Sequence, residues 1–421
     1  MENNNNSSIK LSKHKHLDLF IILFFATVAI ATALITCSVL GVFENGTGYY
    51  ALELADATGQ VKYATGIECN LFFKGNGFEV NSKKKKATNL YNERMEYIYM
   101  QTSAYIDYSP YATGIAYINN NLDRDIIVTD TLYNILKDAY QKSLLDNNYS
   151  IFAAPIYHEW DILLYSGTLG EYDNDPLIYE EEKNYLNDLA NIVNDTNNYS
   201  LLFKDNNTVN LSISETYREF RETHEMDSPI ISLNVLENAY QMNYVSQELE
   251  KEGYKDGYLI DEYGSGITLS NFSSLNLELF NITDGESQSY GYLEEKGSYV
   301  FSFNHHFLAT SKQIGTCYTL EHEEEYYYRS SYIDLNNGLS SDYYLFTGLI
   351  SKQASLLDVV LENQSIAVID DMIEENEYLN NLDDRYQICL LKKNDGKTLK
   401  VSESLINDLT IYKNDYTIVI I

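Results

Sequence analysis

The chain has 421 residues and a formal net charge of −33, with 62 acidic against 29 basic side chains. This balance excludes a nucleic-acid binder, which needs a basic face to neutralise phosphates, and it opposes a main domain that lies flat on anionic lipid. Hydrophobic residues make up 44% of the chain, which is enough for a packed core, and only 4 prolines are present. The length therefore predicts one large domain or two ordinary ones, without a proline-rich linker.

The first predicted element is a transmembrane helix at residues 19–42, a stretch without any charged side chain. At about 1.5 Å of rise per residue it is roughly 36 Å long, which is enough to cross a hydrocarbon core of about 30 Å. Residues 1–18 carry several lysines, whereas the segment that follows the apolar run begins acidic. The positive-inside rule therefore predicts a single-pass protein of the cell membrane, with tail 1–18 in the cytoplasm and residues 43–421 exported.

Two other fates of this N-terminal segment stay open. A cleaved signal peptide is disfavoured because the apolar run is longer than an ordinary signal core and shows no obvious Ala-x-Ala cleavage site. A lipoprotein signal ending at Cys37 is disfavoured because Thr36 is a poor residue directly before the lipid-carrying cysteine. We therefore interpret the segment as an uncleaved anchor.

The remaining cysteines, Cys69, Cys317 and Cys389, are far apart in the sequence and show no spacing typical of a metal site. They allow either one disulfide or three buried thiols.

The exported part predicts interspersed strands and helices. Alternating apolar and polar residues with glycine breaks predict a strand hairpin at 50–80, and a short basic loop follows at 83–86. Apolar residues at helical spacing predict helices at 87–108, 130–145, 179–192 and 233–252. Further strands are predicted at 209–213, 257–260, 299–303, 389–392 and 417–421, with a polar loop at 195–207. The predicted class is α+β with mostly antiparallel sheets and packed helices.

Three stretches, in this order, resemble the ApbE-type family of FAD:protein FMN transferases. The first is YSPYATGIAYIN at 108–119, which is similar to the family's S-x-Y-x-x-x-S-x-I-x-x-I-N region before a helix. After that helix the family has G-A-F-D-P-T-x-x-P-L…W, and this chain has YSIFAAPI at 149–156 and then Trp160. The family's Phe-Asp pair is replaced by Tyr149 and Ser150, so its carboxylate is absent.

The second stretch is ISLNVLENAY at 231–240, where the family reads I-D-L-G-G-I-A-K-G-Y. The apolar frame and Tyr240 match, whereas the family's Asp and Lys fall on Ser232 and Asn238. The segment YGSGI at 263–267 then stands where the family has A-G-G-D-I.

The third stretch contains three local matches. Residues 308–311 (LATS) resemble the family's A-T-S-G, and residues 331–338 (SYIDLNNG) stand where the family has H-I-I-D-P-x-T-G. Residues 357–362 (LDVVLE) resemble A-D-A-L-x-T, whose Asp and Thr help to hold Mg²⁺ in the family. The resemblance as a whole covers about residues 65–393.

The resemblance implies the ApbE-type fold, Mg²⁺ as cofactor and FAD as substrate. It implies a metal site at Asp358 and Glu362, which lie four residues apart in a predicted helix and therefore on one face. The catalytic candidate is Asp334, for which capping of a turn is the alternative role. The resemblance also implies cofactor-binding residues, namely Thr113, Tyr240, Thr310 and Ser311.

Three hypotheses about function follow. The first is a membrane-anchored enzyme that attaches FMN from FAD to a Ser or Thr of an exported acceptor protein with Mg²⁺. The second is a catalytically degenerate relative that binds flavin or serves in assembly, because several charged family positions are neutral here. The third is an unrelated surface domain for adhesion or sensing, which accounts for the anchor and the acidity but not for the ordered motifs.

Overall fold

The computed structural model describes residues 45–55, 66–109, 111–165, 175–262, 264–283, 286–305, 317–322, 325–330, 332–341, 343–392, 396–413 and 415–421, together with residues 32, 34, 36 and 38. Most of the predicted anchor at 19–42 therefore lies outside the described residues. Within the described ranges, no helix combines the length and the apolar character that crossing a membrane requires. The anchor stays a prediction.

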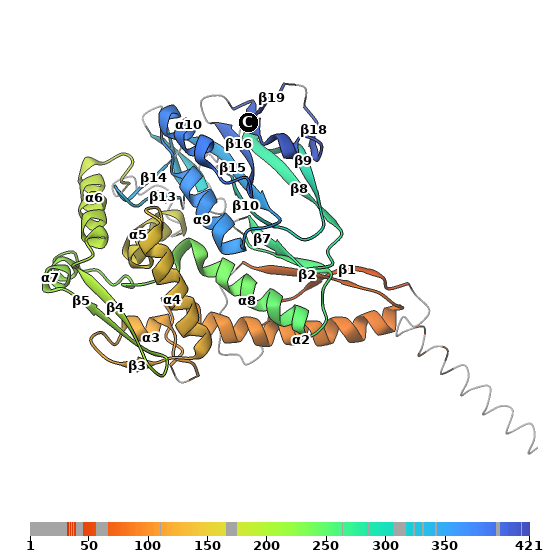
Figure 1. Ribbon diagram of the computed structural model, residues 1–421, viewed down its shortest axis with the longest axis horizontal. Helices are drawn as coiled ribbons and strands as arrows, with labels where there is room; N and C mark the ends of the chain where they lie inside the picture. Colours follow the sequence, from red (N-terminus) through yellow and green to blue (C-terminus); the bar gives the residue numbers. More distant parts are fainter. Residues whose placement is uncertain are drawn as a thin grey trace, which may run out of the picture.

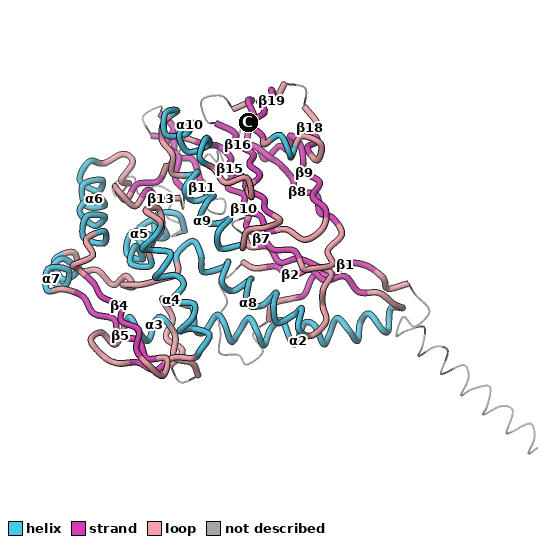
Figure 2. The backbone as a smooth tube through the Cα atoms, viewed as in Figure 1, coloured by secondary structure: helices cyan, strands magenta, loops and turns pink. Residues whose placement is uncertain are grey.

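A mostly antiparallel sheet runs through the centre of the described molecule (Figures 1 and 2). Its strands, in spatial order, are β1 (Gly48–Leu52), β2 (Glu68–Phe73), β6 (Gly257–Ile260), β7 (Ser265–Thr268), β10 (Val300–His305), β15 (Tyr344–Ser351), β16 (Gln387–Lys392), β17 (Thr398–Val401) and β19 (Thr417–Ile420). Only β17 and β19 pair in parallel. The predicted α+β class with antiparallel sheets is confirmed.

The two faces of this sheet are covered differently. Helices α2 (Gly77–Thr102), α8 (Glu237–Lys251) and α9 (Leu356–Ala367) pack on one face. A small sheet of β8 (Ser274–Thr283), β9 (Glu286–Lys296) and β18 (Leu409–Ile411) packs on the other. Strand β10 shows how the sequence separates the faces, because side chains alternate along a strand. Phe301 and Phe303 enter the aromatic core beneath the small sheet, whereas Ser302 meets Asn363 of α9.

A second group of elements lies beside the helical face (Figure 1). It comprises α3 (Ile115–Asn119), β3 (Ile126–Ile127), α4 (Asp130–Leu145), α5 (Ala154–Tyr165), α6 (Glu180–Asn194), β4 (Tyr199–Lys204), β5 (Thr208–Ile213) and α7 (Glu215–Thr223). Its largest buried side chain is Trp160 of α5, whose indole N–H donates to the backbone oxygen of Gly338 at 2.8 Å. Gly338 closes the turn between β13 (Ile333–Asp334) and β14 (Leu339–Ser340), so this bond ties the helical group to the third matched stretch.

Most predicted elements are present, with shifted ends. The helix predicted at 130–145 is α4, capped by the Thr129 side chain, which accepts from Leu132 N. The predicted strands at 209–213, 257–260, 299–303, 389–392 and 417–421 correspond to β5, β6, β10, β16 and β19. Two predicted loops are wrong. Residues 83–86 lie inside α2, which begins after the Asn76 cap, and residues 195–207 contain strand β4.

Cys69 and Cys389 are free, fully buried thiols, so neither joins the disulfide that the sequence left open.

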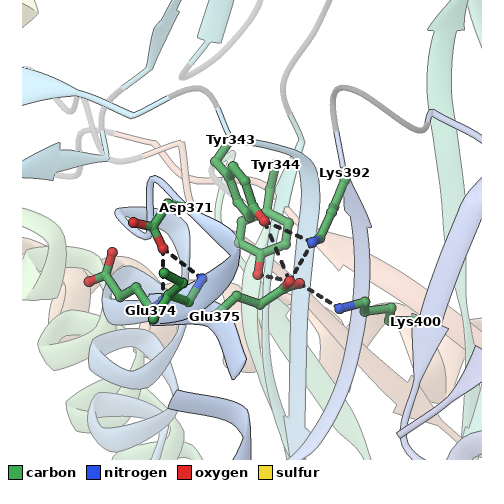
Figure 3. A network of polar contacts seen from close by, with 8 residues as sticks. Tyr343, Tyr344, Asp371, Glu374, Glu375, Lys392 and Lys400 are labelled. Atoms are coloured by element: carbon green, nitrogen blue, oxygen red, sulfur yellow. Dashed lines mark hydrogen bonds and ion pairs between the residues drawn. The ribbon is translucent and has the colours of Figure 1, made fainter. Parts of the chain in front are cut away.

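One ionic cluster joins helix α10 (Met372–Asn381) to the sheet (Figure 3). The fully buried carboxylate of Glu375 pairs with Lys392 and, at 2.9 Å, with Lys400. The Tyr344 hydroxyl donates to the same carboxylate at 2.9 Å. Burial alone would raise the pKa of Glu375, but the hydrogen bonds from the two lysines and the tyrosine lower it below its ordinary value. The cluster therefore holds a charged carboxylate where an isolated one would be costly.

Candidate functional site

A cavity of about 470 Å³ lies where α2, α5, α8 and α9 meet strands β7 and β10. Its volume is typical of small-molecule sites, which occupy roughly 300–1,000 Å³. The described residues that line it are Tyr99, Ser103, Tyr105, Ile106, Tyr157, Asp161, Ser232, Asn234, Val235, Glu237, Asn238, Asp261, Glu262, Ser265, Ser302, Tyr332 and Val360. Four of them are acidic, and none of these described residues is Lys, Arg or His. The cavity thus combines aromatic and aliphatic walls with an acidic lining.

The first matched stretch positions the second at this cavity. Asn119, which ends the first stretch, accepts from Ile230 N at 3.2 Å and from Ile231 N at 2.9 Å. Its own amide donates to Ile231 O at 2.9 Å. These bonds fix the backbone directly before Ser232, whose hydroxyl accepts from Asn234 N at 3.1 Å. The N-terminal end of α8 is thereby held against the cavity.

The β6–β7 turn supplies another wall. The Asp261 carboxylate accepts from Ser265 N at 2.8 Å, which closes the turn. Gly264 adopts φ +92, and a Cβ atom there would lie 2.3 Å from the backbone oxygen of Phe303. Only glycine combines this backbone conformation with this close approach. Ser265 then meets Ser302 of the neighbouring strand, hydroxyl to hydroxyl, at 3.0 Å.

Two lining carboxyl groups, Asp161 of α5 and Glu237 of α8, have strongly raised pKa values. Burial raises the pKa of Asp161 to about 7, and a weak hydrogen bond from the Tyr105 hydroxyl at 3.5 Å only partly opposes it. Burial, and then the charge of Asp161, raise the pKa of Glu237 to about 8. The Gln241 amide donates to Glu237 at 3.1 Å and orients it. Near neutral pH these two groups are therefore partly protonated and exchange protons readily.

The residues predicted to bind Mg²⁺ are close to each other but are engaged elsewhere. Asp358 forms an ion pair with Lys142 of α4 at 2.9 Å. Burial opposes ionisation of Asp358, yet hydrogen bonds from Lys142 and Ser355 hold its pKa below the ordinary value. Glu362 accepts a short hydrogen bond from the Tyr378 hydroxyl, and burial raises its pKa.

Each of these two carboxylates therefore already has a partner within the chain. An ammonium group occupies the open side of Asp358, and the described part of the chain contains no group of three His, Cys, Asp or Glu side chains that could hold a metal ion.

The remaining predicted site residues that the structure describes lie outside the cavity lining. The Asp334 carboxylate accepts from Asn336 N at 2.9 Å and from the Asn337 amide at 2.7 Å, so it caps its own turn. The buried Tyr240 donates to Asp138 at 2.6 Å. Thr113 lies half-buried in the loop before α3. Thr310 and Ser311 belong to the part of the chain that the structure does not describe.

The sequence interpretation missed the acidic pair Asp161 and Glu237. Each lies beside a landmark of the resemblance, because Asp161 follows Trp160 and Glu237 precedes Asn238. A charged residue directly beside a motif position was the available signal. A motif comparison identifies the charged family residues that this chain lacks. It does not identify charged residues, such as Asp161 and Glu237, that stand beside the motif positions.

No protein-family model matches the chain. No curated protein matches it either. Solved structures do match. A flavin transferase ApbE from Vibrio cholerae has a TM-score of 0.56 and 13% identity, over 86% of this chain and 99% of that one. The ApbE protein from Thermotoga maritima has a TM-score of 0.57, with the same identity and coverage. A flavinyl transferase ApbE from Pseudomonas stutzeri, in its apo form, has a TM-score of 0.53 and 10% identity, over 87% and 99%.

At such low identity the likeness establishes the fold: this chain has an ApbE-like fold over most of its length. The fold that the resemblance implied is confirmed.

Proposed function

We propose that this chain is a flavin transferase-like protein that binds the flavin of FAD in the cavity and transfers FMN to a Ser or Thr of an exported acceptor protein. The observation that carries the proposal is the convergence of separate matched stretches. Ser232 and Asn238 from the second stretch and Ser265 from the segment after it line one cavity. The structures that share this fold are described as flavin transferases.

The chain's own groups suit the binding of a flavin ring. Tyr99, Ile106 and Val235 offer aromatic and aliphatic surface, and the polar side chains of the same lining offer donors and acceptors for the ring edge. Phosphoryl transfer also requires neutralisation of the pyrophosphate and an acceptor hydroxyl placed in line. The described lining provides no cation for the first task. Mg²⁺, when bound, would supply that charge neutralisation, and in this proposal it competes with Lys142 for Asp358.

A second candidate function is a flavin-binding or assembly protein without turnover. The acidic lining and the occupied Asp358 favour it, since both leave the developing phosphate charge without a partner. An unrelated adhesion or sensing domain has no support from the fold.

We also propose that the helical group and the sheet both lie outside the cell, with residues 1–18 in the cytoplasm. Protease added to intact cells then removes the large domain and spares the tail. A protected large domain would contradict this topology.

The test of the proposed function uses the purified full chain in detergent, incubated with FAD and MgCl₂. Bound flavin and released FMN or AMP are measured by fluorescence and chromatography. Flavin binding with Mg²⁺-dependent release supports the transferase, whereas binding without release favours the non-catalytic candidate. Asn238→Lys combined with Ser331→His restores two charged family positions and is expected to raise a slow rate. Absence of both binding and release, in wild type and in this variant, would rule out both candidates.

A further inference from the structure

The acidic lining of the cavity has a consequence for the ligand that enters it. Asp161, Glu237 and Glu262 line the cavity together with Asp261. Within the described residues, none of the first three forms an ion pair, whereas lysines elsewhere in the chain neutralise Glu375 and Asp358. Like charges in a partly buried space repel one another strongly, because water screens them poorly there. A phosphate group, itself an anion near neutral pH, meets the same repulsion.

We propose that Asp161 and Glu237 determine which part of the ligand the cavity takes: the uncharged ring system enters, and the phosphate groups stay outside. This inference rests on the proposed flavin-binding function and names the selectivity of that site. The acidic pair shares the cavity lining with the aromatic and aliphatic side chains of Tyr99, Ile106 and Val235. A flavin ring matches this surface because it is flat and uncharged and carries both hydrogen-bond donors and acceptors at its edge.

The two carboxyl groups serve such a ring in either protonation state. When protonated, each donates a hydrogen bond to a ring carbonyl, and when ionised, each accepts from a ring N–H. Gln241 holds Glu237 through its amide, and Tyr105 meets Asp161, so both side chains keep their positions. Once either carboxyl group is ionised, it repels a phosphate group that approaches it.

The charge of the cavity depends on pH through these groups. Burial raises the pKa of Glu237 and of Asp161, so both lose their protons as the pH rises from 6 to 9. The other titratable groups of the described lining are Tyr99, Tyr105, Tyr157, Asp261, Glu262 and Tyr332. All are acids or phenols, so none becomes positively charged in this range. The discrimination against phosphate therefore increases with pH.

The experiment compares riboflavin, FMN and FAD as ligands of the full chain, in EDTA, by fluorescence titration at pH 6 and pH 8.5. Riboflavin is expected to bind with nearly the same Kd at both pH values. FMN is expected to bind at least about tenfold more weakly than riboflavin at pH 8.5, and this gap narrows at pH 6. This comparison needs no variant.

Two isosteric variants locate the effect. Glu237→Gln and Asp161→Asn each remove one ionisable group and are expected to bring the FMN affinity at pH 8.5 toward that of riboflavin. Glu252→Gln, at the exposed end of the same helix, makes the same change in net charge outside the cavity and is expected to leave the gap unchanged.

The outcomes separate the two proposals. If FMN or FAD binds as tightly as riboflavin at pH 8.5 and the two cavity variants change nothing, the selectivity inference is wrong while the flavin site stands. If none of the three ligands binds at either pH, the proposed function fails, and the inference that rests on it fails too.

Discussion

Buried carboxyl groups in this molecule occupy two opposite environments. Glu375 of α10 contacts two lysines and a tyrosine hydroxyl, and its pKa is lowered (Figure 3). Asp161 and Glu237 have neutral hydrogen-bond partners, and burial raises the pKa of both, with the charge of Asp161 raising that of Glu237 further. The first environment joins a helix to the sheet. The second surrounds a cavity. The carboxylate that is paired with lysines therefore belongs to the structural cluster. The carboxyl groups that form no ion pair within the described residues line the candidate binding site.

The largest expected effect comes from breaking the structural cluster. Replacing Lys392 and Lys400 together by Met leaves the Glu375 carboxylate buried without a cation, and loss of the partners of a buried charge costs about 3–5 kcal/mol. We expect the free energy of unfolding in urea at pH 7 to fall by about that amount. Because the pKa of Glu375 is lowered in the folded state, its contribution is present above the ordinary value of 4.5 and is lost as the pH falls through the folded pKa.

A surface ion pair provides the control for this prediction. Lys397 pairs with Asp415 at 2.6 Å, but more than half of each side chain is exposed. Lys397→Met removes a positive charge from the same sheet and is expected to change the midpoint of unfolding very little. Equal midpoints for the double variant and this control would show that the Glu375 cluster does not stabilise the fold.

The second prediction concerns a carboxylate between the two extremes, Asp358, which has one lysine partner. If Mg²⁺ binds there, Asp358→Asn weakens Mg²⁺-dependent FAD binding or turnover by about tenfold or more, because an anionic ligand is lost. Lys142→Met removes the competing ammonium group and is expected to lower the Mg²⁺ concentration needed for half-saturation. Magnesium titrations of FAD binding measure both. An unchanged Mg²⁺ dependence in Asp358→Asn would exclude this residue as a ligand.

The sequence predicted the fold better than the site, for physical reasons. Helix 130–145 was predictable because a local cap and an apolar stripe both act within a few residues. The polar loop predicted at 195–207 was wrong because the range contains strand β4, which pairs with β5 through a hairpin turn where Asn206 and Asn207 adopt positive φ values of 57 and 52. Consecutive asparagines favour that turn, so this error was avoidable.

The site depended on contacts that no local pattern contains. Asp161 and Glu237 are far apart in the sequence and meet only because α5 and α8 pack around one cavity. Asp358 and Glu362 were correctly expected to share a helix, but their partners, Lys142 and Tyr378, come from two other helices. A motif resemblance transfers positions from a family. It does not transfer the side chains that this chain places against them.

The third prediction concerns the acidic cavity and has the opposite dependence on pH to the first. Asp161 and Glu237 have folded pKa values near 7 and 8, above their ordinary values of 3.8 and 4.5. Their contribution to stability is therefore fully present below about pH 4 and is lost as the pH rises through the folded pKa values. The variant Asp161→Asn, Glu237→Gln carries no ionisable group at either position. We expect its melting temperature to approach that of the wild type below about pH 4, where both carboxyl groups are protonated in the folded chain and largely protonated in the unfolded one.

At pH 9 the same variant is expected to melt several degrees higher than the wild type, because each unit by which a folded pKa is raised corresponds to about 1.4 kcal/mol of lost stability once the group is ionised. Glu252→Gln serves again as the control, since it removes an exposed carboxylate from the same helix and leaves the cavity unchanged. A variant that removes two carboxylates and still shows the wild-type dependence of melting temperature on pH would mean that these groups ionise normally in the folded protein. The contrast between a neutralised cluster and an acidic cavity would then have no electrostatic basis, because both environments would hold ordinary carboxylates.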